Sequence, residues 1–186
     1  MLFRSRKLLR VLKYLNGSRE RGIVIRPGKD LELKGYIDAS YGIHTNGKSH
    51  TGCMIALGEG PVYVKSTKQK IVTKSSAEAE LVALSDESSQ IIGCREFLLA
   101  QGYDLPPAII YQDNKSTIAM AEKGMHSNSR TRHINIRYFF IKDRIDSGDI
   151  QLKYLETNNM LADILTKPLQ GETFKRLRDL ITNWSF

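Results

Sequence analysis

Residues 74–84 read K-S-S-A-E-A-E-L-V-A-L, and at this stretch the chain changes from strand-like runs to a long helix. Ser75 and Ser76 are both favourable N-cap residues, and Glu78 stands three positions after Ser75, as in a capping box. Apolar residues then recur at helical spacing over several further turns. The stretch therefore predicts a long helix that carries Glu80 one turn beyond its start.

The residues before this helix have the pattern of a β-meander. Turn signals at Asn46-Gly47 and at residues 58–60, G-E-G, separate runs that favour strands. Consecutive strands joined by such short turns pair in the antiparallel sense. The predicted strands cover residues 31–39, 51–57 and 61–65.

After the long helix the chain alternates between strands and helices. The predicted order is β-β-β-α-β-α-α-β-α, which favours an α/β fold with a mixed sheet covered by helices. The later strands are predicted at 108–111 and 150–155, and the later helices at 115–123 and 134–146, with helical segments at 158–166 and 171–183 together forming the last helical part of this order.

Length and composition favour one globular domain with short additions. The chain has 186 residues, of which 41% are hydrophobic, and no apolar run approaches the roughly 18 residues needed to cross a bilayer. We expect no membrane partner and no secretory leader. The expected divisions are a basic helical segment at 1–30, a main domain at 31–168 and a C-terminal helix at 169–186.

The net charge of +8 is concentrated at the N-terminus. Residues 1–34 hold 10 Lys and Arg against 3 acids, whereas residues 35–186 hold 18 against 17. The basic segment includes a predicted amphipathic helix at 5–16. Two interpretations stay open: the helix contacts a polyanion such as nucleic acid, or it is a solvated helix that packs against another part of a longer protein.

Four acids occupy positions where a nuclease could use them. Asp38 and Asp113 fall at the ends of predicted strands, Glu80 lies on the long helix, and Asp163 belongs to a later helical segment. Clustered carboxylates require cations, and oxygen ligands suit Mg²⁺ or Mn²⁺. With 20 acids in the chain, the spacing alone leaves structural roles open, including helix capping.

At these acids the chain closely resembles the ribonuclease H domain of copia-type LTR retrotransposon polyproteins. The resemblance covers residues 31–170 in the family's order. The matching stretches are Y-I-D-A-S-Y-G (36–42), K-S-H-T-G (48–52), K-S-S-A-E-A-E-L-V-A-L (74–84), Y-Q-D-N-K-S-T-I-A-M-A (111–121), S-R-T-R-H-I-N-I-R-Y-F-F-I (129–141) and N-M-L-A-D-I-L-T-K (159–167).

This resemblance implies a ribonuclease H fold, with a five-stranded mixed sheet whose first three strands are antiparallel. It implies a metal-dependent endonuclease that hydrolyses the RNA strand of RNA/DNA hybrids with two Mg²⁺ ions, for which Mn²⁺ can substitute. Asp38, Glu80, Asp113 and Asp163 match its four catalytic and metal-binding carboxylates, with Asp38 between the two ions. E-L-V-A selects Glu80 over Glu78.

The resemblance also implies partners and a location. The partners are the RNA/DNA hybrid and the reverse transcriptase domain of the same polyprotein, to which residues 1–30 would connect. The expected location is the cytoplasm, within virus-like particles, with the nucleus as the alternative. The chain departs from bacterial relatives in two respects: the loop T-N-N-M-L at 157–161 lacks their histidine, and no separate insertion matches the basic protrusion that they often carry.

Several further residues are predicted to contact the hybrid. Basic side chains would bind phosphates, and small polar ones would contact 2′-hydroxyls. For the lysines of residues 65–74 a solvated loop is an equal alternative, and Ser76 and Asn114 are also candidate helix caps. The predicted nucleic-acid-binding residues are Ser40, Lys74, Ser76, Asn114, Arg130, Arg132 and His133.

A second hypothesis belongs to another class of function. The chain could be a catalytically inactive nucleic-acid-binding or structural module of a decayed retroelement polyprotein. Retention of all four acids argues against decay.

Overall fold

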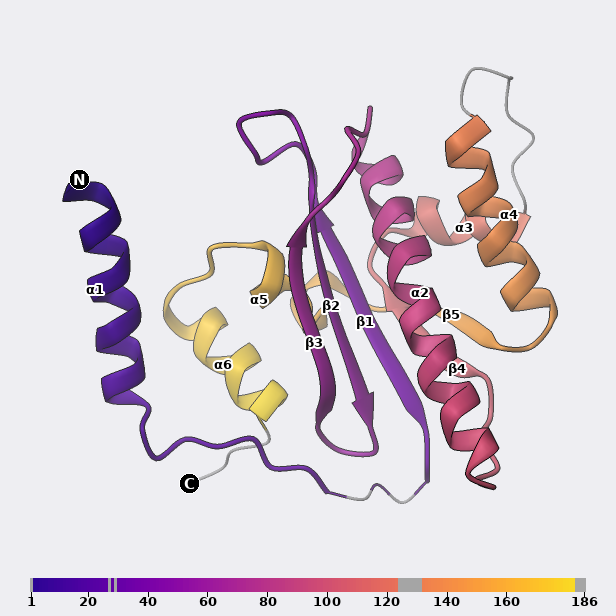
Figure 1. Ribbon diagram of the computed structural model, residues 1–186, viewed down its shortest axis with the longest axis horizontal. Helices are drawn as coiled ribbons and strands as arrows, with labels where there is room; N and C mark the ends of the chain where they lie inside the picture. Colours follow the sequence, from indigo (N-terminus) through magenta and orange to yellow (C-terminus); the bar gives the residue numbers. More distant parts are fainter. Residues whose placement is uncertain (1, 27, 29, 124–131, 183–186) are drawn as a thin grey trace.

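The computed structural model describes residues 2–26, 28, 30–123 and 132–182. Its centre is a five-stranded sheet with helices on both faces (Figure 1). The strands are β1 (Leu33–Ser40), β2 (His50–Leu57), β3 (Pro61–Lys68), β4 (Ala108–Gln112) and β5 (Ile150–Tyr154). The helices are α1 (Leu2–Gly17), α2 (Ser76–Ala100), α3 (Lys115–Lys123), α4 (Arg132–Asp146), the 3-10 turn η2 (Thr157–Asn159), α5 (Asp163–Thr166) and α6 (Gly171–Thr182).

The strand order β3-β2-β1-β4-β5 places the first strand in the middle of the sheet. β1 pairs antiparallel with β2, which pairs antiparallel with β3. On its other side β1 pairs parallel with β4, and β4 with β5. The predicted mixed sheet with three antiparallel strands is therefore confirmed. Because β1 and β4 run in the same direction, their C-terminal ends lie at the same edge.

One face of the sheet is covered by α2. Gly35 in β1 permits this close approach, since a Cβ there would lie 2.4 Å from Cδ1 of Ile91 in α2. Side chains of the same face, including Ile37 and Ile55, are fully buried in the main core. Their alternation along the strands leaves Asp38 and its partner Gly52 on the opposite face.

The opposite face is covered by the short helix α5, which rests on β2 and β1. Gly52 permits this contact: a Cβ there would lie 2.7 Å from Cγ2 of Thr166, 2.8 Å from Cβ of Leu165 and 3.0 Å from the carbonyl oxygen of Ala162. The absent side chain at Gly52 therefore sets how closely α5, and with it Asp163, approaches β1.

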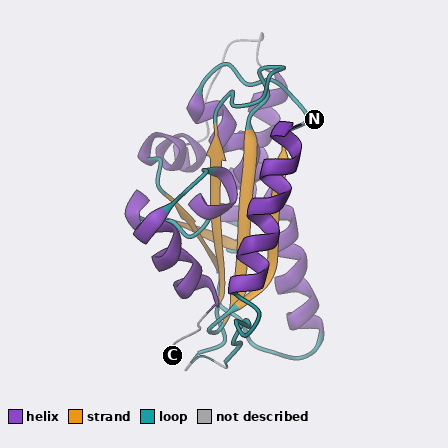
Figure 2. Ribbon diagram, turned by 90° about the vertical axis from the view of Figure 1, so that its left-hand side faces the viewer, coloured by secondary structure: helices purple, strands orange, loops and turns teal. Residues whose placement is uncertain are grey.

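The N-terminal helix stands apart from the sheet in Figure 1, and Figure 2 views the molecule from that side, with the helix in front of the strands. The predicted helix at 5–16 is confirmed as α1. The ring of Tyr14 in α1 contacts the ring of Phe174 in α6, with the two ring centroids 5.8 Å apart. The leucines Leu8, Leu12 and Leu15 are exposed. No helix in the described part of the chain is long and apolar enough to cross a membrane.

Two predicted elements differ from the observed ones. The single helix predicted at 158–166 is divided into η2 and α5, because the backbone turns to an extended conformation at Met160 and buries that side chain completely. Strand β3 continues to Lys68, three residues beyond the predicted end, because Ser66, Thr67 and Lys68 still have partners along β2.

Replacing Gly52 with Ala should destabilise the fold by about 1–3 kcal/mol, because the added methyl overpacks the contact between β2 and α5. The matched control is Gly93→Ala, at an exposed site of α2 where a Cβ would meet nothing within 4 Å. That change should stabilise the helix by up to about 1 kcal/mol. Urea unfolding measures both, and equal stabilities for the two variants would contradict the role given to Gly52.

Candidate metal centre

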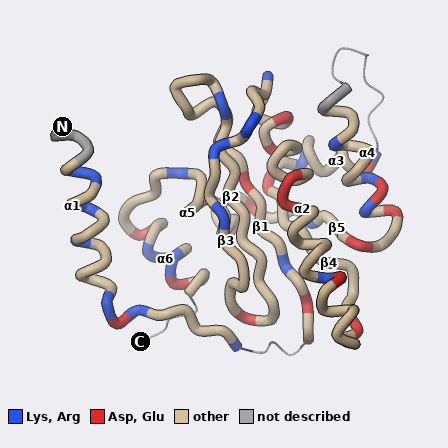
Figure 3. The backbone as a smooth tube through the Cα atoms, viewed as in Figure 1, with Lys and Arg blue, Asp and Glu red and all other residues tan. Residues whose placement is uncertain are grey.

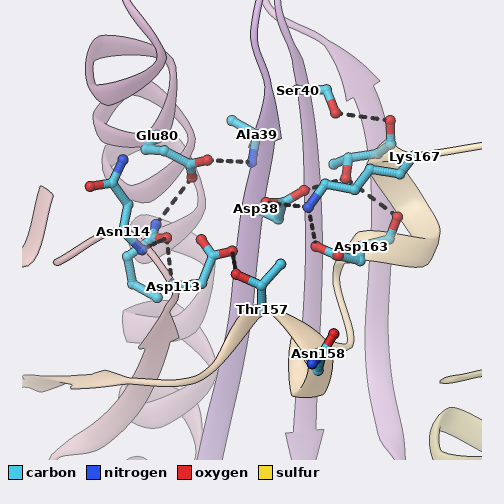
Figure 4. A network of polar contacts seen from close by, with 12 residues as sticks. Asp38, Ala39, Ser40, Glu80, Asp113, Asn114, Thr157, Asn158, Asp163 and Lys167 are labelled. Carbon is cyan, nitrogen blue, oxygen red and sulfur yellow. Dashed lines mark hydrogen bonds and ion pairs between the residues drawn. The ribbon is translucent and has the colours of Figure 1, made fainter. Parts of the chain in front are cut away.

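Three carboxylates converge at the edge of the sheet where β1 and β4 end. Asp38 lies in β1, Glu80 on the first turns of α2, and Asp113 directly after β4. Each offers one oxygen, and these oxygens all lie within 4.8 Å of one another. Asp38 and Glu80 are buried, whereas Asp113 is only partly so. The cluster therefore combines two buried acids with one that is partly exposed, and Figure 4 shows how they lie at the strand ends.

Glu80 is held by two donors from the sheet. The backbone N–H of Ala39 donates to Oε1 at 3.3 Å, and the side-chain amide of Gln112 donates to Oε2 at 3.2 Å. The other atom of that amide, Oε1, accepts the backbone N–H groups of Asp113 and Asn114. Gln112 thereby ties the position of Glu80 to the turn that carries Asp113.

The two aspartates of this cluster are each held by a threonine. Thr157, in the η2 turn after β5, donates its hydroxyl to Oδ2 of Asp113 at 2.8 Å. Thr166, at the end of α5, donates to Oδ2 of Asp38. Both contacts join segments far apart in the sequence.

Asp163 lies beside this cluster and forms an ion pair with Lys167. Nζ of Lys167 lies 2.6 Å from Oδ1 of Asp163 and 3.7 Å from Oδ1 of Asp38. The fourth predicted acid therefore comes close to Asp38, on the side away from Glu80 (Figure 4).

Burial makes these carboxylates costly to ionise. It raises the pKa of Glu80, and together with the charges of Asp38 and Asp113 it brings that pKa to about 9. Burial also raises the pKa of Asp38, which Thr166 and Lys167 partly offset, and the pKa of Asp163, which Lys167 partly offsets. For Lys167, burial lowers the pKa, but the contacts with Asp163 and Asp38 outweigh it and the pKa is raised.

The donor set fits an oxygen-liganded divalent cation. The three converging groups are all carboxylates, with no His or Cys among them, and hard cations such as Mg²⁺ and Mn²⁺ prefer such ligands. A cation there would stabilise the ionised forms that burial opposes. Asp38, Glu80 and Asp113 could hold one ion, and Asp38 with Asp163 could share a second.

Glu78, the alternative to Glu80, is a capping residue. Its carboxylate accepts the backbone N–H of Lys74 at 2.7 Å, and its own N–H donates to Oγ of Ser75 at 3.2 Å. Ser75 is therefore the N-cap of α2, and Ser76 is the first helical residue.

The predicted nucleic-acid-binding residues are dispersed around this centre. Ser40 donates its hydroxyl to the carbonyl of Thr166 at 3.1 Å, and Asn114 caps α3 by accepting the N–H of Thr117 at 3.1 Å. Lys74 and Ser76 are exposed at the start of α2. Arg130 lies outside the described residues, as do the side chains of Arg132 and His133, whose backbones begin α4.

Basic residues lie along β3 and the loop that leads into α2 (Figure 3). Lys65, one of the predicted phosphate contacts, is paired with the buried Glu87 at 2.8 Å. Its charge therefore serves to hold β3 against α2. Lys68 and Lys70 are exposed.

Four residues around the acids carry no prediction from sequence: Gln112, Thr157, Thr166 and Lys167. An amide or hydroxyl has no motif of its own, because its role depends on a partner far away in the chain. Lys167 offered one signal, since it follows Asp163 at the i+4 spacing of a helical ion pair.

Comparison with known proteins identifies relatives over nearly the whole chain. The retrovirus-related Pol polyprotein from transposon RE2 of Arabidopsis thaliana is 37% identical over 171 residues, which is 90% of this chain and 12% of that protein. The Pol polyprotein from transposon TNT 1-94 of Nicotiana tabacum is 31% identical over 172 residues, 92% of this chain and 13% of that protein. No family model matches.

Solved structures share the fold at low sequence identity. LC11-RNase H1, isolated from compost, has a TM-score of 0.55 at 15% identity, covering 79% of this chain and 98% of its own. The same enzyme in complex with an RNA/DNA hybrid gives 0.51 at 14% identity, with coverages of 72% and 93%. A foamy viral protease-reverse transcriptase in complex with dsDNA gives 0.50 at 20% identity, with coverages of 76% and 96%.

The five-stranded mixed sheet with helices on both faces, together with the similarity to these solved structures, identifies a ribonuclease H fold. The chain belongs to the copia-type retrotransposon Pol family, and spans about an eighth of the length of the relatives it matches. The predicted family resemblance and fold are both confirmed.

Without divalent cations, stability should fall as pH rises from about 4.5 to 9. The folded protein keeps a proton on Glu80 across this range, because the pKa rises from 4.5 to about 9, while the unfolded chain releases it. The free energy of unfolding therefore decreases with pH. Replacing Glu80 with Gln should flatten this dependence, on the order of 2 kcal/mol between pH 5 and 8.

Urea unfolding in EDTA at both pH values measures the effect. The matched control is Glu122→Gln, on the exposed side of α3. An E80Q slope equal to that of the wild type would show that Glu80 does not carry the raised pKa.

Proposed function

We propose that this chain is a metal-dependent endonuclease that hydrolyses the RNA strand of RNA/DNA hybrids. The observation that carries the proposal is the convergence of Asp38, Glu80 and Asp113 at one edge of a ribonuclease H fold. Membership of the retrotransposon Pol family supports it, since reverse transcription produces such hybrids.

The proposed metal ligands are Asp38, Glu80, Asp113 and Asp163, with Mg²⁺ as the ion and Mn²⁺ as a substitute. Two such ions about 4 Å apart would activate a water and stabilise the leaving oxygen of the phosphodiester. Asp38 would serve both ions, because it lies between the other two cluster acids and Asp163. No side-chain nucleophile is then required.

The residues around the acids would keep them in position for this reaction. Thr157 and Thr166 orient the aspartates, and Gln112 links Glu80 to the Asp113 turn. Since these donors come from different elements, the carboxylates keep their places without relying on the metal. Asp113, the least buried of the cluster, is the acid that faces the open side where a substrate phosphate would approach.

The contacts with the hybrid are proposed from the predicted set. Ser76 lies four residues before Glu80 on α2, so the two share one helix face. Asn114 directly follows Asp113, and Lys74 stands exposed before α2. These positions favour a hybrid that crosses the starts of α2 and α3. Ser40, Arg130, Arg132 and His133 complete the proposed contacts.

The wider setting is proposed from the relatives. We expect the domain to act with the reverse transcriptase of the same polyprotein, in cytoplasmic virus-like particles. The expected domain divisions at residues 30 and 168 also stay predictions. An inactive nucleic-acid-binding module is the alternative that the following experiment separates.

Replacing Asp113 with Asn should lower the rate of hybrid cleavage more than about 100-fold, because a metal ligand is lost while the shape is kept. Cleavage of a hybrid labelled on its RNA strand, measured in Mg²⁺ and in EDTA, tests this. The control is Asp104→Asn, at an exposed acid outside the cluster. Circular dichroism and gel retardation should show D113N folded and still binding the hybrid.

Equal cleavage by D113N and the wild type would refute the assigned mechanism. A wild-type protein that retards the hybrid but does not cut it with Mg²⁺ or Mn²⁺ would instead favour the inactive module.

A further inference from the structure

Lys167 divides the acidic centre into two parts. On one side, Asp38, Glu80 and Asp113 form the three-carboxylate cluster, and the contacts that hold Glu80 and Asp113 come from neutral donors. On the other side, the ammonium of Lys167 contacts both Asp163 and Asp38. Among the described residues, Lys167 is the one basic side chain that forms ion pairs with the four acids, and it pairs with Asp38 and Asp163.

The ammonium lies where a second cation would bind. Its Nζ atom lies 2.6 Å from Asp163 and 3.7 Å from Asp38, so it stands between the two carboxylates that a second divalent ion would have to share. Two cations cannot occupy this space together, because their repulsion at such short distance is strong. Either the lysine or the ion holds the pair.

The side chain of Lys167 has room to move away from the two acids. Lys167 is the C-cap residue of α5, and its side chain is 34% exposed although both partner acids are nearly buried. It also lines a cavity of about 520 Å³ between α1, α5 and α6, with Tyr14 and Phe174 among the other lining residues. A flexible four-carbon stem allows the ammonium to move there without disturbing the helix.

We propose that Lys167 is a built-in counter-ion that holds Asp38 and Asp163 together in the metal-free protein, and that a second divalent cation binds only by displacing it. The inference rests on the proposed function for the identity of the displacing ion. It makes Lys167 a positioning residue that sets the affinity of the second site more strongly than that of the three-carboxylate site, with which it shares only Asp38.

The experiment uses the whole chain and three variants. Lys167→Met removes the charge and keeps the length of the side chain, whereas Lys167→Arg keeps the charge. Lys142→Met is the matched control, because Lys142 also forms an ion pair at i,i+4 spacing, with Asp146 on α4. Mn²⁺ binding is measured by calorimetry and by the electron paramagnetic resonance of free Mn²⁺, and thermal unfolding is recorded in EDTA and in Mn²⁺.

In EDTA, the midpoint of thermal unfolding of K167M should fall by about 4–8 °C, because two buried carboxylates lose their counter-ion. Saturating Mn²⁺ should restore it. The second Mn²⁺ should bind K167M at least about tenfold more tightly than the wild type, and the first ion should gain less, because Asp38 alone of its three ligands contacts the lysine. K167R should retain the wild-type midpoint and weak second site, and K142M should match the wild type throughout.

A second Mn²⁺ that binds K167M and K142M equally would overturn the proposal. So would a K167M midpoint in EDTA equal to that of K142M. If K167M does not fold in EDTA, the comparison is made in the Asp163→Asn background, where one of the two acids is neutral. There the protein with the same lysine substitution should fold in EDTA, and failure to fold in that background as well would refute the pairing.

Failure of this proposal is distinguishable from failure of the nuclease proposal. Mn²⁺ stoichiometry and unfolding midpoints do not depend on cleavage. If the protein shows the expected effects of the Lys167 substitutions but cuts no hybrid, the counter-ion proposal holds and the nuclease proposal fails. If the protein cuts the hybrid but shows none of these effects, the nuclease proposal holds and the counter-ion proposal fails.

Discussion

The structure depends on keeping several carboxylates close together in a partly buried place. The oxygens of Asp38, Glu80 and Asp113 lie within 4.8 Å of one another, and burial raises the pKa of Glu80 to about 9. Such an arrangement opposes folding unless protons or cations neutralise it. The surrounding elements are therefore best understood by what each contributes to holding these groups in place.

Each contribution comes from a different part of the fold. The central position of β1, antiparallel to β2 and parallel to β4, brings Asp38 and Asp113 to one edge. Gly52 lets α5 approach the sheet closely enough for Thr166 to reach Asp38. Thr157 reaches Asp113 from the turn after β5. The site is thus assembled only when the sheet and both layers of helices are in place.

The family assignment and the chemistry of the site have different grounds. Membership of the retrotransposon Pol family follows from sequence identity over 90% of the chain, while the shared fold follows from structures at 20% identity or less. Neither describes how the charges of this particular site are balanced. That balance follows from the contacts here, where Glu80 has neutral donors and Asp163 has a lysine.

The sequence by itself determined the element order, the start of α2 at Ser75 and Ser76, and the four acids as candidates, because capping, turn and periodicity signals are local. The break at Met160, the extension of β3 to Lys68 and the roles of Gln112, Thr157, Thr166 and Lys167 were decided only by the tertiary structure. Each depends on a contact between distant segments, or on what a buried side chain must reach. Local patterns name the groups that can react, whereas long-range packing decides what neutralises and orients them.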